Sequence, residues 1–363
     1  MKRIRVKLKQ NGYEVLIGRG LLRGAGRELR RNLPSTGSKI VIVTSPTIRH
    51  HWSSRLEQSL QREKLQYQVL EMNDGEPAKR LQTVEQLAEQ MVAAGTDRRA
   101  LLVAFGGGVV GDCAGFLASI FMRGIPVVQI PTTVLAQVDA SIGGKTGVNL
   151  RSGKNLVGTF HQPKSVLVDP ELLETLEERE FRAGLFESLK CGVIRDRKLF
   201  DFMERQAEKI RGRDSAAIER IILDSVRVKA AVVSADERES GPRRILNFGH
   251  TIGHALEAAT GYDRILHGEA VAWGMMAAAS IAEEIGTCDR ETAERIRAAV
   301  ETYGPLPSIR VETREVTSRL TSDKKAIAGD IHWVLPRKIG KVKIVSGVSS
   351  TVVERVVERI CNC

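Results

Sequence analysis

The sequence lacks long apolar runs, and this absence argues against an integral membrane protein. No stretch of the 363 residues approaches the roughly 20 apolar residues that a membrane-spanning helix requires. The basic amino-terminal stretch, MKRIRVKLK, also lacks the apolar centre of a secretory signal peptide. We therefore expect a cytoplasmic protein that has no membrane partner.

Cysteine and aromatic residues are also scarce. The five cysteines are odd in number and scattered, so they predict no disulfide framework, and we expect Cys361 and Cys363 to be reduced thiols of a chain end. Aromatic residues make up only 4% of the chain, and no Lys/Arg tract is interleaved with them. The net charge of +11 therefore favours anionic substrates or a solvated basic surface over a nucleic-acid site.

Strand and helix patterns alternate over the first part of the chain. Residues 3–17 alternate around Asn11-Gly12, which predicts a hairpin. Apolar runs predict further strands, the last of them closing the sheet, at 39–45, 65–71, 100–105, 125–130 and 165–170. Helical patterns lie at 47–63 and 80–94. We predict a Rossmann-like α/β domain with a parallel sheet over 1–170, and a mainly α-helical domain over 171–363.

A glycine-rich turn follows the predicted strand at 100–105. Gly106, Gly108 and Gly111 satisfy G-x-G-x-x-G between a strand and a helix, where glycines allow a pyrophosphate to approach the backbone. A plain turn is the alternative. In a Rossmann domain, an acidic residue at the end of a strand about twenty positions later binds the ribose. This sequence has no acidic residue at such a position. We therefore expect the nucleotide ribose to be held in another way.

Residues 131–163 have the composition of a long loop. They are rich in Gly, Thr, Ser and Asn, and they contain Asp139, Lys145, Lys154 and Asn155. So long an unstructured connection in a compact domain is usually functional, and these side chains suit phosphate and polyol ligands. A solvated loop without function is the alternative.

Three of the seven histidines lie between residues 243 and 269. With Asn247 as the helix N-cap, His250 and His254 are four residues apart on one helix face, and His267 follows where the chain returns. A carboxylate from elsewhere would complete a three-ligand metal site with an open position. The spacing is not a standard zinc signature, so clustered core or surface histidines are the alternative.

Two lysines lie on apolar helix faces. Glu187 and Lys190 are three residues apart on one face, and Lys229 falls on a stripe with Val226 and Val233. A lysine on a core face is costly unless its charge is used or paired. Snorkelling toward the surface is the alternative.

Several longer motifs resemble those of the 3-dehydroquinate synthase family, which belongs to the sugar phosphate cyclases. They are GGGVVGDCAGFLASIFMRG, PTTVLAQVDASIGGKTGVNL, GKNLVG, LNFGHTIGHALE and LHGEAVAWGM. The resemblance implies conversion of 3-deoxy-D-arabino-heptulosonate 7-phosphate to 3-dehydroquinate and phosphate, a step of the shikimate pathway. It also implies NAD and Zn²⁺ (or Co²⁺) as cofactors.

The resemblance also implies roles for individual residues. The metal ligands correspond to Glu187, His250 and His267, so that His254 is not a ligand. The NAD contacts correspond to Asp74, Gly75, Glu76, Lys79, Gly107, Gly108, Val109, Val110, Gly111, Asp112, Thr132, Thr133, Lys145, Lys154, Leu172, Leu173, Glu174 and Thr175. The substrate contacts correspond to Arg123, Lys154, Asn155 and one of Lys324 and Lys325. The catalytic positions correspond to Asp139, Lys145, Lys190, Lys229, Arg243, Asn247 and His254. In the family, the arginine at the position of Arg123 reaches the partner's phosphate site, which implies a homodimer.

The chain departs from the family pattern in two places. The strand that ends at Thr44 lacks the aspartate that many members carry there for the adenosine ribose. Ser188 and Cys191 also replace the usual neighbours of Glu187 and Lys190. Three rivals remain: a sister cyclase that acts on glucose 6-phosphate or sedoheptulose 7-phosphate, a metal-dependent polyol dehydrogenase that releases NADH, and a non-enzymatic basic binding module that the net charge alone supports.

Overall fold

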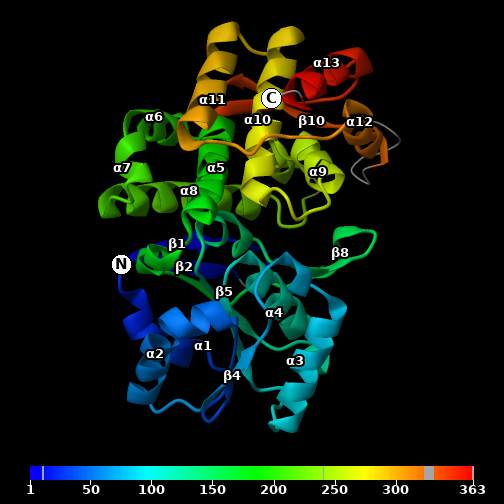
Figure 1. Ribbon diagram of the computed structural model, residues 1–363. Helices are drawn as coiled ribbons and strands as arrows, with labels where there is room; N and C mark the ends of the chain where they lie inside the picture. Colours follow the sequence, from blue (N-terminus) through cyan, green and yellow to red (C-terminus); the bar gives the residue numbers. More distant parts are fainter. Residues whose placement is uncertain (10–11, 240, 323–330, 362–363) are drawn as a thin grey trace. The chain divides into compact units, whose positions relative to one another are not determined.

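The computed structural model describes residues 1–9, 12–239, 241–322 and 331–361, with the backbone alone for residues 321 and 322. The chain forms two compact units (Figure 1). The first contains Met1–Glu177 and Lys229–Arg238, and the second contains Glu178–Val228 and Glu239–Cys363. The boundary between residues 170 and 171 stays a prediction. The assignment of Lys229–Arg238 to the first unit has no counterpart in the sequence analysis.

A seven-stranded sheet forms the centre of the first unit, in the order β1-β2-β9-β6-β5-β3-β4. Neighbouring strands are parallel except β1 and β2, which form the predicted antiparallel hairpin. The sequence analysis predicted that the strand at 165–170 closes the sheet. This prediction was wrong, because that strand, β9, lies between β2 and β6. The strands are β1 (Lys2–Val6), β2 (Tyr13–Ile17), β3 (Ile40–Thr44), β4 (Tyr67–Glu71), β5 (Leu101–Gly106), β6 (Val127–Pro131) and β9 (Ser165–Val168).

Helices cover both faces of this sheet because its strands carry apolar side chains on both sides. In β3, Val41 and Val43 belong to the core formed with α3 and α4, whereas Ile40 and Ile42 belong to the core formed with α1 and α2. The predicted Rossmann-like α/β class is therefore confirmed. The helices are η1 (Leu21–Gly24), α1 (Ala25–Asn32), α2 (Pro46–Arg62), η2 (Glu76–Ala78), α3 (Leu81–Ala93), α4 (Gly108–Ile120), η3 (Phe121–Arg123) and η5 (Pro170–Thr175).

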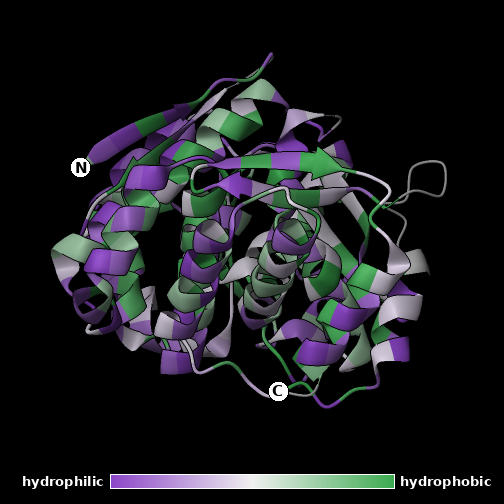
Figure 2. Cartoon of the chain, turned by 90° about the horizontal axis from the view of Figure 1, so that it is seen from above, coloured by the Kyte–Doolittle hydropathy of each residue, from purple (hydrophilic) through white to green (hydrophobic). Residues whose placement is uncertain are grey.

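The edge strand β1 is basic. Lys2, Arg3 and Arg5 are exposed, whereas Val6 is buried. Figure 2 shows hydrophilic and hydrophobic residues alternating along this strand beside the N label. This alternation is typical of a strand that has one face on the core.

Residues 131–163 are not a loop, so that prediction was wrong. They form the short π-helix η4 (Ala136–Ala140) and a hairpin of β7 (Lys145–Leu150) and β8 (Gly153–Phe160). Gly147 pairs with Gly158, and a Cβ on Gly158 would lie 2.0 Å from the carbonyl oxygen of Thr146. Glycine is therefore required inside this hairpin, although glycine and asparagine are depleted in ordinary strands. The same residues that made the segment resemble a loop allow its strands to pair closely.

The second unit is mainly helical, as predicted, and contains one small hairpin. Its elements are α5 (Glu178–Ile194), α6 (Arg197–Arg205), α7 (Ala207–Arg211), α8 (Ser215–Ala235, up to residue 228), η6 (Pro242–Asn247), α9 (His250–Ala259), α10 (His267–Glu284), α11 (Arg290–Tyr303), α12 (Thr313–Ser322), β10 (Trp333–Lys338), β11 (Lys341–Val345) and α13 (Ser350–Cys361). Among the described residues, no helix combines the length and the apolar character needed to span a bilayer.

Helices α9 and α10 pack with their backbones in close contact. A Cβ on Gly274 would lie 1.8 Å from the carbonyl oxygen of Gly249, and one on Gly253 would lie 2.8 Å from that of Ala270. These contacts fix an antiparallel register, because position 249 faces 274 while 253 faces 270. The register sets where the side chains at the start of α10 meet those of α9.

The predicted cap of the histidine helix was wrong. Asn247 ends η6, and α9 begins at His250 after Gly249, which has a φ of 80°. Only glycine adopts this left-handed conformation without strain, so Gly249 turns the chain into the helix. His267 is the first residue of α10 rather than part of the connection before it.

Candidate metal and nucleotide sites

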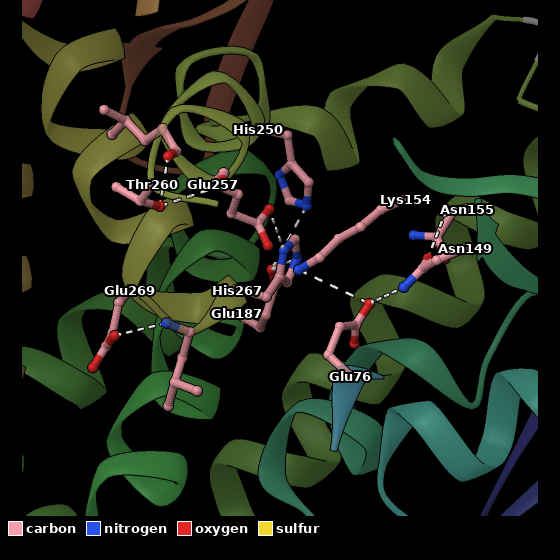
Figure 3. Close-up of polar contacts among 12 residues, drawn as sticks. Glu76, Asn149, Lys154, Asn155, Glu187, His250, Glu257, Thr260, His267 and Glu269 are labelled. Carbon is pink, nitrogen blue, oxygen red and sulfur yellow. Dashed lines mark hydrogen bonds and ion pairs between the residues drawn. The ribbon is translucent and has the colours of Figure 1, made fainter. Parts of the chain in front are cut away.

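A carboxylate and two imidazoles from three helices converge in the second unit (Figure 3). Glu187 comes from α5, and His250 and His267 each begin a helix. Glu187 Oε1 lies 3.8 Å from His250 Nε2 and 3.7 Å from His267 Nε2. One possible ligand atom from each residue lies within 4.8 Å of the other two. The structure thus brings together the three residues that the sequence predicts as metal ligands.

Hydrogen bonds fix the orientation of both rings. His250 Nδ1 lies 3.1 Å from the carbonyl oxygen of Phe248, and His267 Nδ1 lies 3.1 Å from Glu257 Oε2. Both partners are acceptors, so each Nδ1 carries the proton and each Nε2 keeps its lone pair. The two lone pairs are then available to a cation beside Glu187, as in metal sites where outer hydrogen bonds orient the histidines.

The state of Glu187 tests whether a divalent cation fits. Its side chain is 1% exposed, and among the described residues no donor satisfies hydrogen-bond geometry at either oxygen. Lys190, equally buried, forms an ion pair with it. The Lys190 ammonium group offsets part of the cost of burying this carboxylate, and a cation shared with two imidazoles would offset more of it. The donor set of one carboxylate and two histidines fits catalytic zinc, which keeps a position open.

His254 lies beside these ligands but does not join Glu187. Its ring centroid is 5.2 Å from that of His250 and 5.8 Å from that of His267. It belongs to a second group of possible ligands, formed with Glu257 and His267. The His250–His254 spacing therefore brings two rings together without making both of them partners of Glu187.

Opposing effects act on the pKa of His267. Burial lowers the pKa of the imidazole, but the Glu257 carboxylate raises it by charge and by hydrogen bonding, and the result is a raised pKa. The ring is a good electron donor for the same reason, because a carboxylate on Nδ1 increases its basicity.

A second polar cluster, in the first unit, surrounds Lys79. This lysine is 4% exposed, and its ammonium group donates to Asp112 Oδ2 at 2.6 Å and to Asn155 Oδ1 at 2.5 Å. Burial lowers the pKa of Lys79, but the carboxylates of Asp112 and Glu76 together raise it by more, so the net shift of the pKa is upward. Lys79 is therefore a buried cation that links three segments of the chain.

The β7–β8 hairpin attaches to this cluster through asparagines. Asn149 donates to Glu76 Oε1 at 2.7 Å and accepts from the Asn155 backbone at 2.9 Å, and Lys154 Nζ lies 3.9 Å from Glu76 Oε1 (Figure 3). Asn155 has a φ of 54°, a conformation that asparagine tolerates better than most residues. These bonds hold Lys154 and Asn155 beside the carboxylate of Glu76.

The glycine motif has the predicted context. Gly106 ends β5, α4 begins at Gly108, and the Thr132 backbone donates to the Gly106 carbonyl at 3.0 Å. A Cβ on Gly107 would lie 3.0 Å from Thr133 Cγ2. The free backbone N–H groups at a helix N-terminus favour an anionic group such as a pyrophosphate.

Comparison with known proteins identifies the family. Residues 69–183 match the family described as 3-dehydroquinate synthase N-terminal, and residues 184–326 match 3-dehydroquinate synthase C-terminal. The 3-dehydroquinate synthase of Koribacter versatilis (strain Ellin345) is 54% identical over 360 residues, which cover 99% of this chain and 98% of that protein. The chain belongs to the 3-dehydroquinate synthase family.

Solved structures of sugar phosphate cyclases share the family's fold. The 2-epi-5-epi-valiolone synthase of Streptomyces hygroscopicus subsp. jinggangensis 5008, with NAD⁺ and Zn²⁺ bound, has a TM-score of 0.90 at 30% identity and covers 98% of each chain. A 2-deoxy-scyllo-inosose synthase complexed with carbaglucose-6-phosphate, NAD⁺ and Co²⁺ has a TM-score of 0.87 at 27% identity, covering 99% of this chain and 100% of that one. The two-part α/β and helical architecture is thus that of these cyclases.

Other positions that the family resemblance implies lie in both units. In the first unit, Lys229 donates to Asp139 Oδ1 at 2.7 Å, which pairs the buried lysine of α8 with η4. Lys145 begins β7 and is exposed. In the second unit, Arg243 is buried in η6, and Asn247 donates to Glu239 Oε1 at 2.8 Å. Lys324 and Lys325 lie outside the described residues.

The remaining positions implied for the family's NAD site form short local contacts. Asp74 Oδ2 accepts from Thr47 Oγ1 at 2.9 Å, and Thr47 lies in the first turn of α2. This turn follows β3, whose end at Thr44 lacks the aspartate of many family members. Thr175 accepts from Trp52 at 2.8 Å, and Glu174 accepts from Arg19 at 2.7 Å. Leu172 and Leu173 are buried in η5, and Val109 and Val110 lie in the first turn of α4.

Sequence reasoning missed three polar residues that hold these clusters. Glu257 orients His267, Glu239 binds Asn247, and Asn149 anchors the β7–β8 hairpin. A weak signal existed for Glu257, since it lies seven residues after His250 and so faces the same side of the helix. Glu239 carries no comparable signal, because it stands outside any periodic pattern.

Proposed function

We propose that this chain converts 3-deoxy-D-arabino-heptulosonate 7-phosphate into 3-dehydroquinate and phosphate, with NAD⁺ and Zn²⁺ or Co²⁺ as cofactors. The observation that carries the proposal is the buried Glu187 carboxylate, which two oriented imidazoles face in a member of the 3-dehydroquinate synthase family. Further support comes from the two solved cyclases, whose cofactors are NAD⁺ with Zn²⁺ or Co²⁺.

The cofactors supply the redox chemistry. When bound, NAD⁺ would supply reversible hydride transfer, and the cation would polarise a substrate hydroxyl. Glu187, His250 and His267 would hold the cation. The start of α4, together with the Lys79 cluster, would hold NAD⁺, because a helix N-terminus and a buried ammonium group both attract pyrophosphate.

The chain's own residues bind and orient the substrate. Lys154, Asn155 and Arg123 would hold the phosphate dianion by charge-assisted hydrogen bonds. Lys190, Arg243, Asn247 and His254 would bind the substrate carboxylate and hydroxyls. The pair of Lys229 and Asp139, at 2.7 Å, offers a proton donor and acceptor beside each other.

The elimination and ring closure need positioning more than additional catalytic groups. Oxidation to a ketone acidifies the neighbouring C–H bond, whose proton passes to an oxygen of the substrate's own phosphate as the C–O bond to that phosphate breaks. After the hydride returns, the ring opens and an intramolecular aldol addition closes the carbocycle. Exclusion of water and correct orientation of the reacting groups are then the main contributions of the protein.

The test is phosphate release from the heptulosonate 7-phosphate with NAD⁺ and Zn²⁺ supplied, while absorbance reports NADH. Phosphate release without net NADH would support the proposal, since the redox cycle closes internally. Steady accumulation of NADH would instead indicate a polyol dehydrogenase. Release only from glucose 6-phosphate or sedoheptulose 7-phosphate would indicate a sister cyclase.

Replacing Lys154 by alanine is expected to weaken substrate binding. A charge-assisted hydrogen bond contributes about 1.5–3 kcal/mol, so the KM for the sugar phosphate should rise roughly 10- to 100-fold. The bound metal should remain, because the proposed ligands are Glu187, His250 and His267, and the substitution leaves all three in place. Steady-state kinetics at saturating NAD⁺, with metal analysis, checks both. Lys164→Ala, at an exposed site after β8, is the matched control, and an unchanged KM for Lys154→Ala would refute the role.

We also propose that the protein is a cytoplasmic homodimer in which Arg123 serves the partner's phosphate site. Arg123 is exposed at the end of η3, and both it and Met122 have positive φ values, 69° and 47°. Ile120 and Met122, 47% and 48% exposed, add apolar surface beside it. Light scattering on the purified protein should give twice the chain mass of 39.9 kDa, and a mass of one chain would contradict the proposal.

A further inference from the structure

We propose that Glu257 is a positioning residue that holds His267 ready for the metal. The inference rests on the proposed metal site and adds a residue that carries no role in the sequence analysis. Glu257 lies on α9, is 1% exposed, and places Oε2 3.1 Å from His267 Nδ1 (Figure 3). A buried carboxylate aimed at a ligand imidazole is an arrangement that tunes metal affinity in other proteins.

The register of α9 and α10 places Glu257 there. Gly249 meets Gly274 and Gly253 meets Ala270 through backbone contacts that leave no room for a Cβ. One turn further along α9 is Glu257, and one turn back along α10 is its first residue, His267. The carboxylate is therefore brought to the ring by two packed helix backbones rather than by a mobile loop.

The contact sets both the proton and the donor strength of the ring. An ionised carboxylate accepts the Nδ1 proton, which leaves the lone pair of His267 on Nε2, the atom 3.7 Å from Glu187 Oε1. Its negative charge also makes the ring a stronger donor to a cation. Nδ1 of His250 faces the neutral carbonyl oxygen of Phe248, whereas Nδ1 of His267 faces the carboxylate of Glu257.

A competing interpretation makes Glu257 a ligand in a group with His254 and His267. The geometry argues against it, because Glu257 Oε2 lies in the hydrogen-bonding direction of His267 Nδ1 at 3.1 Å. Two atoms bound to one tetrahedral zinc ion lie about 3.3 Å apart, so the distance alone does not decide between the two interpretations. The orientation of the ring does, because its other nitrogen, Nε2, faces Glu187 Oε1 at 3.7 Å and is the atom left for a cation. Glu257 therefore acts on the ring and not on the ion.

The experiment measures Zn²⁺ affinity of the full chain by competition with a chromogenic chelator. Glu257→Gln keeps the size and an acceptor but removes the charge, and Glu257→Ala removes both. We expect Kd to rise about 10-fold for the glutamine variant and about 100-fold for alanine. The visible bands of the Co²⁺-loaded glutamine variant should shift as well, because the donor strength of the ring changes.

Asp224→Asn is the matched control for loss of a buried carboxylate. Asp224 is 4% exposed on α8, pairs with Arg220 and Arg227, and belongs to neither group of possible metal ligands among the described residues. Its variant should lower the melting temperature of the metal-free protein while leaving Zn²⁺ affinity unchanged. Glu257→Gln should show the reverse pattern. Its Zn²⁺ affinity should fall, while the melting temperature of its metal-free form changes too little to account for that fall.

The outcomes separate this inference from the proposed function. Wild-type Zn²⁺ affinity and Co²⁺ bands in folded Glu257→Gln would overturn the positioning role and leave the metal site intact. If the wild type binds no Zn²⁺, or His267→Ala binds it equally well, the proposed metal site itself fails. Should alanine at 257 prevent folding, Glu257→Asp withdraws the charged oxygen by one methylene, and unchanged affinity there would also count against the role.

Discussion

Alanine at His250 or His267 is expected to remove the bound cation and to lower turnover at least about 1,000-fold. The magnitude follows because metal polarisation contributes several kcal/mol to the transition state, and about 1.4 kcal/mol corresponds to a factor of ten. Each variant leaves Glu187 with one imidazole, since the two Nε2 atoms lie 3.8 and 3.7 Å from its Oε1. Metal analysis after gel filtration, combined with phosphate release, measures both losses.

His254→Ala is the control for these variants. It removes an equivalent ring, 5.2 Å from that of His250, that belongs to the group of possible ligands formed with Glu257 and His267. We expect this variant to keep its metal while turnover falls, because His254 is proposed to bind substrate. Loss of metal in His254→Ala with retention in His250→Ala would contradict the assignment and favour the group of His254, Glu257 and His267.

Alanine at Gly274 is expected to destabilise the protein by about 3 kcal/mol or more, at the upper end of the cost of overpacking a core. A Cβ there would lie 1.8 Å from the carbonyl oxygen of Gly249, and a backbone atom cannot move aside as a flexible side chain can. At a helical glycine that has free space around it, the same change to alanine would instead stabilise the protein by roughly 1 kcal/mol. The sign of the effect is therefore diagnostic, and urea unfolding measures it.

Gly24→Ala is the control for Gly274→Ala. Its Cβ would meet no atom within 4 Å, and its φ of −111° is open to alanine. We expect this variant to unfold at the wild-type urea concentration or slightly above it. Equal stability of the two alanine variants would mean that α9 and α10 separate without cost, and the register that places Glu257 beside His267 would lose its basis.

The sequence predicted the parallel strands and the family well because these depend on local patterns. The strand runs, the glycine turn and the long motifs are contiguous, and each was recognisable without tertiary information. The convergence of Glu187, His250 and His267 was expected only through the family resemblance, since residues 187 and 250 are 63 positions apart. The structure brings the three together, while their role as ligands stays a prediction.

The failures have a common physical cause. Asn247 has the composition of a helix cap, yet its side chain binds Glu239, and Gly249 takes over the turn because it adopts a φ of 80°. Residues 131–163 resemble a loop because their glycines serve strand pairing at 147 and 158. The spacing of Glu257 from His250 is a weak signal, and its contact with His267 follows only from the register of α9 and α10. In each case, tertiary contacts decide between local alternatives.

The basic edge strand β1 bears on behaviour at high concentration. Within the described sheet it has β2 on one side and no strand on the other, so its outer backbone groups could template pairing with another molecule. Exposed Lys2, Arg3 and Arg5 make such an approach unfavourable, because a second copy would bring the same charges. Part of the chain's excess of positive charge thus acts as protection against aggregation.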